Sequence, residues 1–253
     1  MPPQPPLTPP PPPFLLATIR AVTFDCYGTL VDWESGIKRY VAPHLERAAR
    51  AGIHVTPEAW LRAWEPIQFE LIRPGQPWRP YREILEESWQ LAMKALELEC
   101  FADGGPGLVR SLSEWPAFGD TVPALRRMAR RRRLAIVSNV DRALLAETLG
   151  RLQAPFSALI TAEDARAYKP DEAPFALALA RLGLPPASIL HAAFGWRYDL
   201  GPARRLGLRT CFVNRAGHVG HAASVDGAGA PAADLEVPSL ATLADWLDGS
   251  TGG

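Results

Sequence analysis

Four stretches of the chain place polar side chains at or just after short apolar runs. Asp25 follows TIRAVTF, Ser138 and Asn139 end LAIVSN, Lys169 lies in the loop after ALITA, and Asp199 lies just beyond ILHAAF. In an open parallel sheet the ligand crevice lies at the carboxyl ends of the strands. The four stretches therefore predict one crevice that contains two carboxylates, a lysine and two small hydrogen-bonding side chains.

This combination of residues is typical of a hydrolase that works through a covalent intermediate. We predict that Asp25 is the nucleophile and that Lys169 lowers its pKa by about 1 to 3 units, which would keep it an anion. Asp199, less well paired, would then deprotonate the water that opens the ester.

The elements that must position these residues alternate along the chain. Helical patterns separate the apolar runs, and several of them have Pro near the start and Gly at the end. The alternation predicts an α/β fold, a doubly wound parallel sheet of the Rossmann-like kind. The predicted strands are 18–24, 134–139, 158–162, 189–194 and 209–214, and the predicted helices among them are 171–183, 201–207 and 239–249.

Residues 36–117 break this alternation with amphipathic helical patterns rich in Trp, Glu and Arg. We predict that they form a helical cap inserted into a core domain of residues 14–35 and 118–253. Residues 1–13 are mostly proline and predict a disordered leader. Four cap tryptophans either line an aromatic pocket or form the cap's own core: Trp60, Trp64, Trp78 and Trp89.

Composition excludes several classes of function. The 27 basic and 27 acidic residues leave no net field for nucleic acid or anionic lipid, and the basic run at 126–133 reads as a solvated helix face. Three scattered cysteines fit no disulfide framework or zinc site, and without an export or membrane-spanning pattern we expect a cytoplasmic protein. His218 and His221 lie in a Gly-rich stretch at 215–234 that predicts a surface loop.

Four motifs together resemble the haloacid dehalogenase (HAD) superfamily. The resemblance implies a HAD core with a cap, in which Asp25 is the nucleophile and Thr29 and Ser138 position it and the substrate. It also implies that Lys169 is the counter-charge and Asp199 the acidic residue of the fourth motif. The motifs are FDCYGTLVD (24–32), VSN (137–139), YKP (168–170) and YDLGPARRLGL (198–208).

Within the superfamily the chain is similar to the type II 2-haloacid dehalogenases, through FDxYGTL and the pair Ser138 and Asn139. This similarity implies an enzyme that needs no cofactor and hydrolyses small 2-haloacids. Asn139 would hold the departing halide, and Tyr198 would form part of the apolar wall. Tyr27 and Trp196 complete the predicted substrate-binding set.

The chain departs from both groups at named positions. Superfamily phosphatases have a second Asp two residues after the nucleophile, where this chain has Tyr27, and Gly195 stands where a magnesium ligand is expected. The fourth-motif Ser and Asn of the dehalogenases appear here as Phe194 and Trp196. Glu65 stands about where their cap arginine is expected.

Two other functions stay open at this point. One is a magnesium-dependent phosphatase in which the Tyr27 carbonyl, Asp25 and Asp199 hold the ion. The other is a binding protein that keeps the fold without turnover. The favoured dehalogenase predicts no metal site and a small organic acid as its ligand, and the chain could pair as a homodimer.

Overall fold

The computed structural model describes residues 16–215 and 232–249. The predicted leader at 1–13 lies outside these residues, as do His218 and His221. No helix within the described ranges combines the length and the apolar character that crossing a membrane requires.

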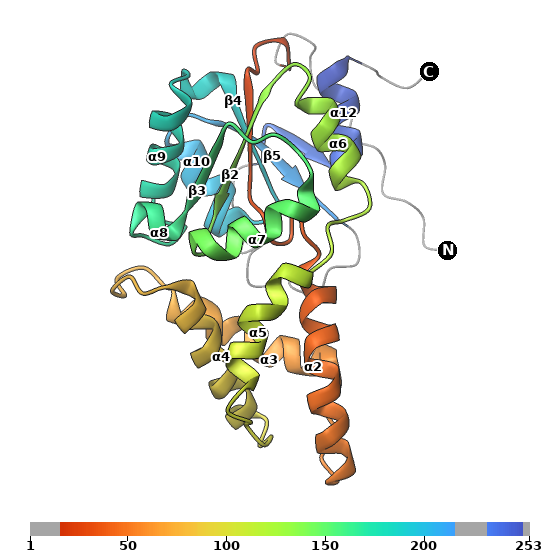
Figure 1. Cartoon of the computed structure of the whole chain (residues 1–253). Helices are drawn as coiled ribbons and strands as arrows, with labels where there is room; N and C mark the ends of the chain where they lie inside the picture. Colours follow the sequence, from red (N-terminus) through yellow and green to blue (C-terminus); the bar gives the residue numbers. More distant parts are fainter. Residues whose placement is uncertain (1–15, 216–231, 250–253) are drawn as a thin grey trace.

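Six parallel strands form one sheet in the order β3-β2-β1-β4-β5-β6, which confirms the predicted α/β fold (Figure 1). All five predicted strands are present, and β6 is absent from the prediction because three residues are too short to show a strand pattern. The strands are β1 (Ala21–Phe24), β2 (Arg133–Ser138), β3 (Ala158–Thr161), β4 (Ile189–Ala193), β5 (Arg209–Val213) and β6 (Leu235–Val237).

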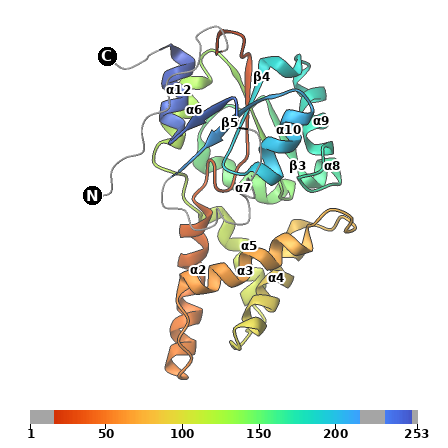
Figure 2. The same cartoon turned by 180° about the vertical axis from the view of Figure 1, so that it is seen from behind.

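Helices cover both faces of the sheet (Figures 1 and 2). One face carries α8 (Ala162–Ala165), α9 (Ala173–Leu182) and α10 (Gly201–Arg205). The other carries α6 (Thr121–Met128), α7 (Arg142–Leu152) and α12 (Leu240–Asp248).

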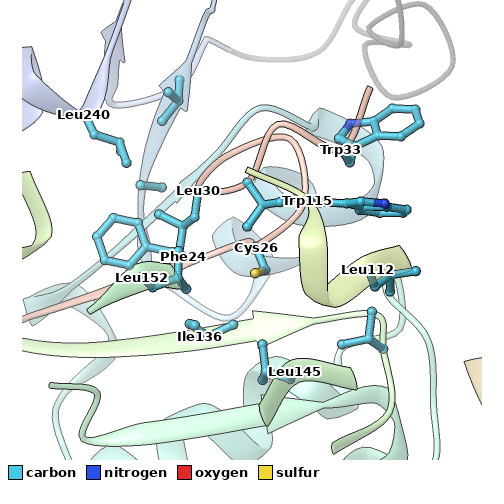
Figure 3. Close-up of a cluster of buried hydrophobic side chains, with 14 of the residues drawn as sticks. Phe24, Cys26, Leu30, Trp33, Leu112, Trp115, Ile136, Leu145, Leu152 and Leu240 are labelled. Atoms are coloured by element: carbon cyan, nitrogen blue, oxygen red, sulfur yellow. The ribbon is translucent and has the colours of Figure 1, made fainter. Parts of the chain in front are cut away.

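Successive strand residues feed these two layers in turn, because side chains alternate across a strand. Val22 and Phe24 of β1 pack in one hydrophobic cluster, whereas Ala21 packs in the other. Figure 3 shows the first cluster, in which Phe24 and Ile136 of the strands meet Leu145 of α7. Helices packed against both faces therefore hold the sheet, and with it the carboxyl ends of its strands, in place.

A separate layer of helices follows β1, and we call it the cap (Figures 1 and 2). Its first helix begins at Trp33. Trp60 and Trp89 are buried inside the cap, with ring centroids 5.2 Å apart, so these two form its own core. The cap consists of α2 (Trp33–Arg50), α3 (Pro57–Leu71), α4 (Tyr81–Ala95), α5 (Gly104–Ser111) and the short turn η1 (Leu112–Glu114) with its C-cap residue Trp115.

The cap is joined to the core at the start of α4. Pro80, the residue before the helix, makes no side-chain cap. Asp141 of the core takes this role, because its carboxylate accepts hydrogen bonds from the main-chain N–H groups of Tyr81 at 2.7 Å and Arg82 at 3.0 Å. Two more contacts join the same region: the Tyr168 hydroxyl donates to the Arg79 carbonyl at 2.7 Å, and the Arg166 guanidinium lies 3.8 Å from the ring centre of Trp78.

Candidate active site

The predicted nucleophile lies at the point where the strand order reverses. The chain leaves β1, passes through the cap, adds β2 and β3 on one side of β1, and then returns to place β4 on the other side. Asp25 is the first residue after β1 and is 6% exposed. Gly28 in the following turn has a φ of +100°, and a Cβ there would lie 2.3 Å from the Phe194 ring, so the turn requires glycine.

Both carboxylate oxygens of Asp25 are held. Lys169 Nζ donates to Oδ1 at 2.9 Å, and Thr29 Oγ1 donates to Oδ2 at 3.0 Å. The Phe194 main-chain N–H donates to the same Thr29 hydroxyl at 3.2 Å. Because this hydroxyl oxygen already accepts one hydrogen bond, its own proton is directed at Asp25, and the carboxylate is fixed in one orientation.

Lys169 is 2% exposed, and its ammonium uses all three donors within the protein. They go to Asp25 Oδ1, to the Val137 carbonyl at 3.0 Å and to Asp199 Oδ1 at 2.5 Å. Asn139 fixes the lysine's backbone: its Oδ1 accepts from Lys169 N at 2.8 Å, and its Nδ2 donates to Lys169 O at 3.2 Å. The lysine therefore acts as a fixed charge between two carboxylates.

Asp199 is paired more fully than the sequence predicts. Besides Lys169, its Oδ1 contacts His191 Nε2 at 3.2 Å, and His191 Nδ1 lies 2.9 Å from Thr23 Oγ1. Burial opposes the ionised form of Asp199, but Lys169 and His191 outweigh it and lower the pKa. The prediction that Asp199 is less well paired is therefore wrong. His191 is absent from the predicted site, and its signal was a lone polar residue in the apolar run ILHAAF.

The predicted pKa shift of Asp25 is also wrong in direction. Burial raises the pKa of Asp25 to about 6, and the negative charge of Asp199 adds to this effect. Lys169 lowers the pKa but does not outweigh burial. The sequence shows the lysine but not the depth at which the carboxyl lies, so it could not weigh the two effects.

A cavity opens over Asp25, Lys169 and Asp199 and runs between the core and the cap. Ser138 lines it, and its buried Oγ has no hydrogen-bond partner among the described residues. Buried polar groups are normally hydrogen-bonded, so this hydroxyl can pair with a water molecule or a ligand in the cavity. In residues 16–215 and 232–249, no three His, Cys, Asp or Glu side chains gather as metal ligands.

Three of the four predicted substrate-binding residues line the cavity: Tyr27, Asn139 and Tyr198. Trp196 is not among the lining residues. It lies in the π-helical turn Trp196–Leu200, where residues two positions apart do not share a face. Trp196 therefore does not join the cavity wall in this structure, and its role in substrate binding stays a prediction.

The cap contributes lining residues that the sequence does not single out. All of them lie where the cap borders the cavity: Trp33, Gln68, Phe69, Ile72, Tyr81 and Trp115. Trp64 also lines the cavity, while Glu65 is buried beside it and is not a lining residue. Helical periodicity shows which residues share a helix face, but not whether that face meets the cap's own core or a cavity.

Comparisons with known proteins agree with this geometry. A family described as haloacid dehalogenase-like hydrolase matches residues 19–192. The (S)-2-haloacid dehalogenase H-109 of Pseudomonas putida is 27% identical over 235 residues, covering 90% of this chain and 98% of that protein. The (S)-2-haloacid dehalogenase 4A of Burkholderia cepacia is 26% identical over 210 residues, covering 81% of this chain and 87% of that protein.

Among solved structures, the fold is similar to that of the L-2-haloacid dehalogenase from Xanthobacter autotrophicus with chloropropionic acid covalently bound. The TM-score is 0.74 at 23% identity, over 91% of this chain and 99% of that one. The family match takes in β1 to β3, most of β4 and the whole cap, the elements that carry Asp25, Lys169 and most of the cavity. The chain therefore belongs to the haloacid dehalogenase-like hydrolase family.

Proposed function

We propose that the protein hydrolyses the carbon–halogen bond of small 2-haloacids through an ester on Asp25. The observation that carries the proposal is the fixed Asp25 carboxylate, paired with Lys169, in a cavity that is also lined by Ser138, whose hydroxyl has no hydrogen-bond partner among the described residues. The names of the relatives point to 2-haloacids as the substrate class.

In the first step an Asp25 carboxylate oxygen attacks C2 of the substrate. The carbon–oxygen bond forms as the carbon–halogen bond breaks, and the halide leaves with the bonding electron pair. Ser138 Oγ donates to the substrate carboxylate, which gives the buried hydroxyl its missing partner. Lys169 keeps its place because Asp25, Asp199 and the Val137 carbonyl hold all three of its protons.

In the second step water attacks the carbonyl carbon of the Asp25 ester. The products are the 2-hydroxyacid, the regenerated carboxylate and one proton, so atoms and charge balance. Asp199 lines the cavity and shares Lys169 with Asp25, and we assign it to orient the water and receive its proton. The site's positive charge comes from Lys169, and we propose that the reaction needs no metal ion.

The test is release of free halide from racemic 2-chloropropionate in excess EDTA. We expect release by the parent protein and none by Asp25→Asn, which removes the nucleophile while conserving size. Asp32→Asn is the matched control, because Asp32 belongs to the same sequence motif but caps α2 through Ser35 and does not line the cavity. Equal release by Asp25→Asn and the parent would remove Asp25 from the mechanism.

The phosphatase is the competing outcome of this experiment. Failure of the parent to release halide, together with magnesium-dependent hydrolysis of phosphate esters, would replace the proposal.

A further inference from the structure

The cap side of the cavity is mainly aromatic, with Gln68, Ile72 and Leu112 beside the rings. Trp33, Trp64, Phe69, Tyr81 and Trp115 line it from the cap. Tyr27, Phe194 and Tyr198 continue the wall from the core, and the rings of Phe69 and Tyr198 stack across the gap with centroids 4.6 Å apart. The charged residues of the cavity, Asp25, Lys169 and Asp199, belong to the core.

Two of the three indole N–H groups of this wall are paired with other cap residues. Trp64 Nε1 donates to Ser88 Oγ at 2.9 Å, and Trp115 Nε1 donates to Ser111 Oγ at 3.1 Å. These pairs leave carbon surface and ring faces for a ligand, so both tryptophans act as apolar groups toward the cavity.

Two tyrosine hydroxyls of the wall are paired in the same way. The Tyr27 hydroxyl lies 2.8 Å from Thr148 Oγ1, and the Tyr81 hydroxyl donates to Gln68 Oε1 at 3.1 Å. Because their polar ends are already satisfied, the rings present an apolar surface. The wall therefore favours an apolar ligand group more strongly than its residue types alone would suggest.

The cap also brings no positive charge to this end of the cavity. Among the described residues that line it, Lys169 is the sole cation, and its three donors are used inside the protein. Glu65 lies next to Trp64, where burial, with the nearby Glu34, raises its pKa to about 8. This cap carboxyl is therefore mostly protonated at neutral pH. A second anionic group on the ligand would find no cationic partner among the described residues at this end of the cavity.

The cavity is larger than the smallest haloacids require. Its volume is about 90 Å³. A single water needs roughly 10 to 15 Å³ of such volume, so the cavity extends well beyond one small group. A haloacetate ion has no carbon substituent at C2 and would leave the aromatic end to water.

We infer that this site selects 2-haloacids whose C2 carries an aromatic or bulky apolar substituent, which lies against the aromatic wall while the carboxylate stays at Ser138. The inference rests on the proposed function for the reaction, and adds the class of substrate. An aromatic ring suits this wall because offset and edge-to-face ring contacts are favourable beyond the burial of area.

The first measurement compares kcat/KM for 2-chloro-3-phenylpropionate and 2-chloropropionate. The phenyl ring is one carbon removed from the reacting carbon, so it does not activate the carbon–halogen bond as a directly attached ring would. We expect kcat/KM to be at least about tenfold higher for the phenyl compound, the size of effect that one well-filled apolar pocket gives.

The second measurement does not depend on turnover. Calorimetry compares the binding of the unreactive 3-phenyllactate and lactate, and we expect the phenyl compound to bind at least about tenfold more tightly. Phe69→Ala shortens the wall at a half-buried position, and it should bring both ratios toward one. Phe101→Ala is the matched control, because Phe101 is a cap aromatic that contacts Arg47 and does not line the cavity; its ratios should equal the parent's.

The outcomes separate the two proposals. Halide release from neither compound, with 3-phenyllactate bound at least tenfold more tightly than lactate, would overturn the reaction and support the ligand class. Halide release from both at similar kcat/KM, or equal binding of the two hydroxyacids, would overturn the inferred selectivity and leave the reaction standing. Retention of both ratios in Phe69→Ala would also overturn it.

Discussion

Replacing Asp141 with alanine should loosen the cap without touching the reacting groups. Asp141 is 5% exposed and belongs to the core, yet its two carboxylate oxygens accept from the first two main-chain N–H groups of the cap helix α4, Tyr81 at 2.7 Å and Arg82 at 3.0 Å. The helix has no side-chain cap of its own. In Asp141→Ala these two donors lose their partner at the boundary between the cap and the core.

The size of the effect follows from these contacts. Loss of an N-cap costs about 0.5 to 2 kcal/mol, and a carboxylate at a helix N-terminus contributes about 0.3 to 1 kcal/mol more. We take about 2 kcal/mol for both together, because the group is buried. Since 1.4 kcal/mol is a factor of ten, local opening at the start of α4 should become about 30-fold more frequent.

The assay is hydrogen exchange at the Tyr81 and Arg82 amides, read against the amides of β1 in the same sample. The reference removes any loss of global stability. Asp171→Ala is the matched control: Asp171 accepts from Ala173 N at 2.8 Å at the start of α9, within the core, and should leave the exchange of α4 unchanged. Exchange at Tyr81 and Arg82 that is the same in Asp141→Ala and the parent would refute this account of how the cap is held.

Three further predictions concern the site itself. Burial raises the pKa of Asp25 to about 6 and only its carboxylate attacks, so kcat/KM for halide release should fall about tenfold per pH unit below 6; a midpoint near 4 would contradict this. Ser138→Ala should raise KM for 2-haloacids about tenfold and leave Tm unchanged, because Ser138 Oγ makes no hydrogen bond with the described residues that the substitution could remove. A fall in Tm would show a structural role. His191→Leu should lower stability by about 1 to 3 kcal/mol in thermal unfolding, because Thr23 and Asp199 lose their buried partner, and an unchanged Tm would rule this out.

The sequence by itself determined the fold class and the floor of the site. The β-branched and apolar runs predict buried strands, and their alternation with helical patterns predicts parallel connections. Parallel strands bring their carboxyl ends to one edge, so residues as distant as Asp25, Lys169 and Asp199 had to meet there. The predictions for Thr29 and Ser138 depend on the same rule, and both side chains lie beside Asp25 or line its cavity.

The tertiary structure alone decided the electrostatic balance and the substrate end of the cavity. The pKa of Asp25 depends on how deeply three groups are buried together, and a sequence does not show burial depth. The partnership of Asp199 with His191 joins two side chains of neighbouring elements whose distance follows from packing. The cap wall depends on how α3 and α4 are rotated about their axes, because a tryptophan such as Trp64 reaches the cavity only if its helix face meets the core. That rotation is set by contacts such as Asp141 with the start of α4, which cross the boundary between cap and core and leave no pattern in either segment.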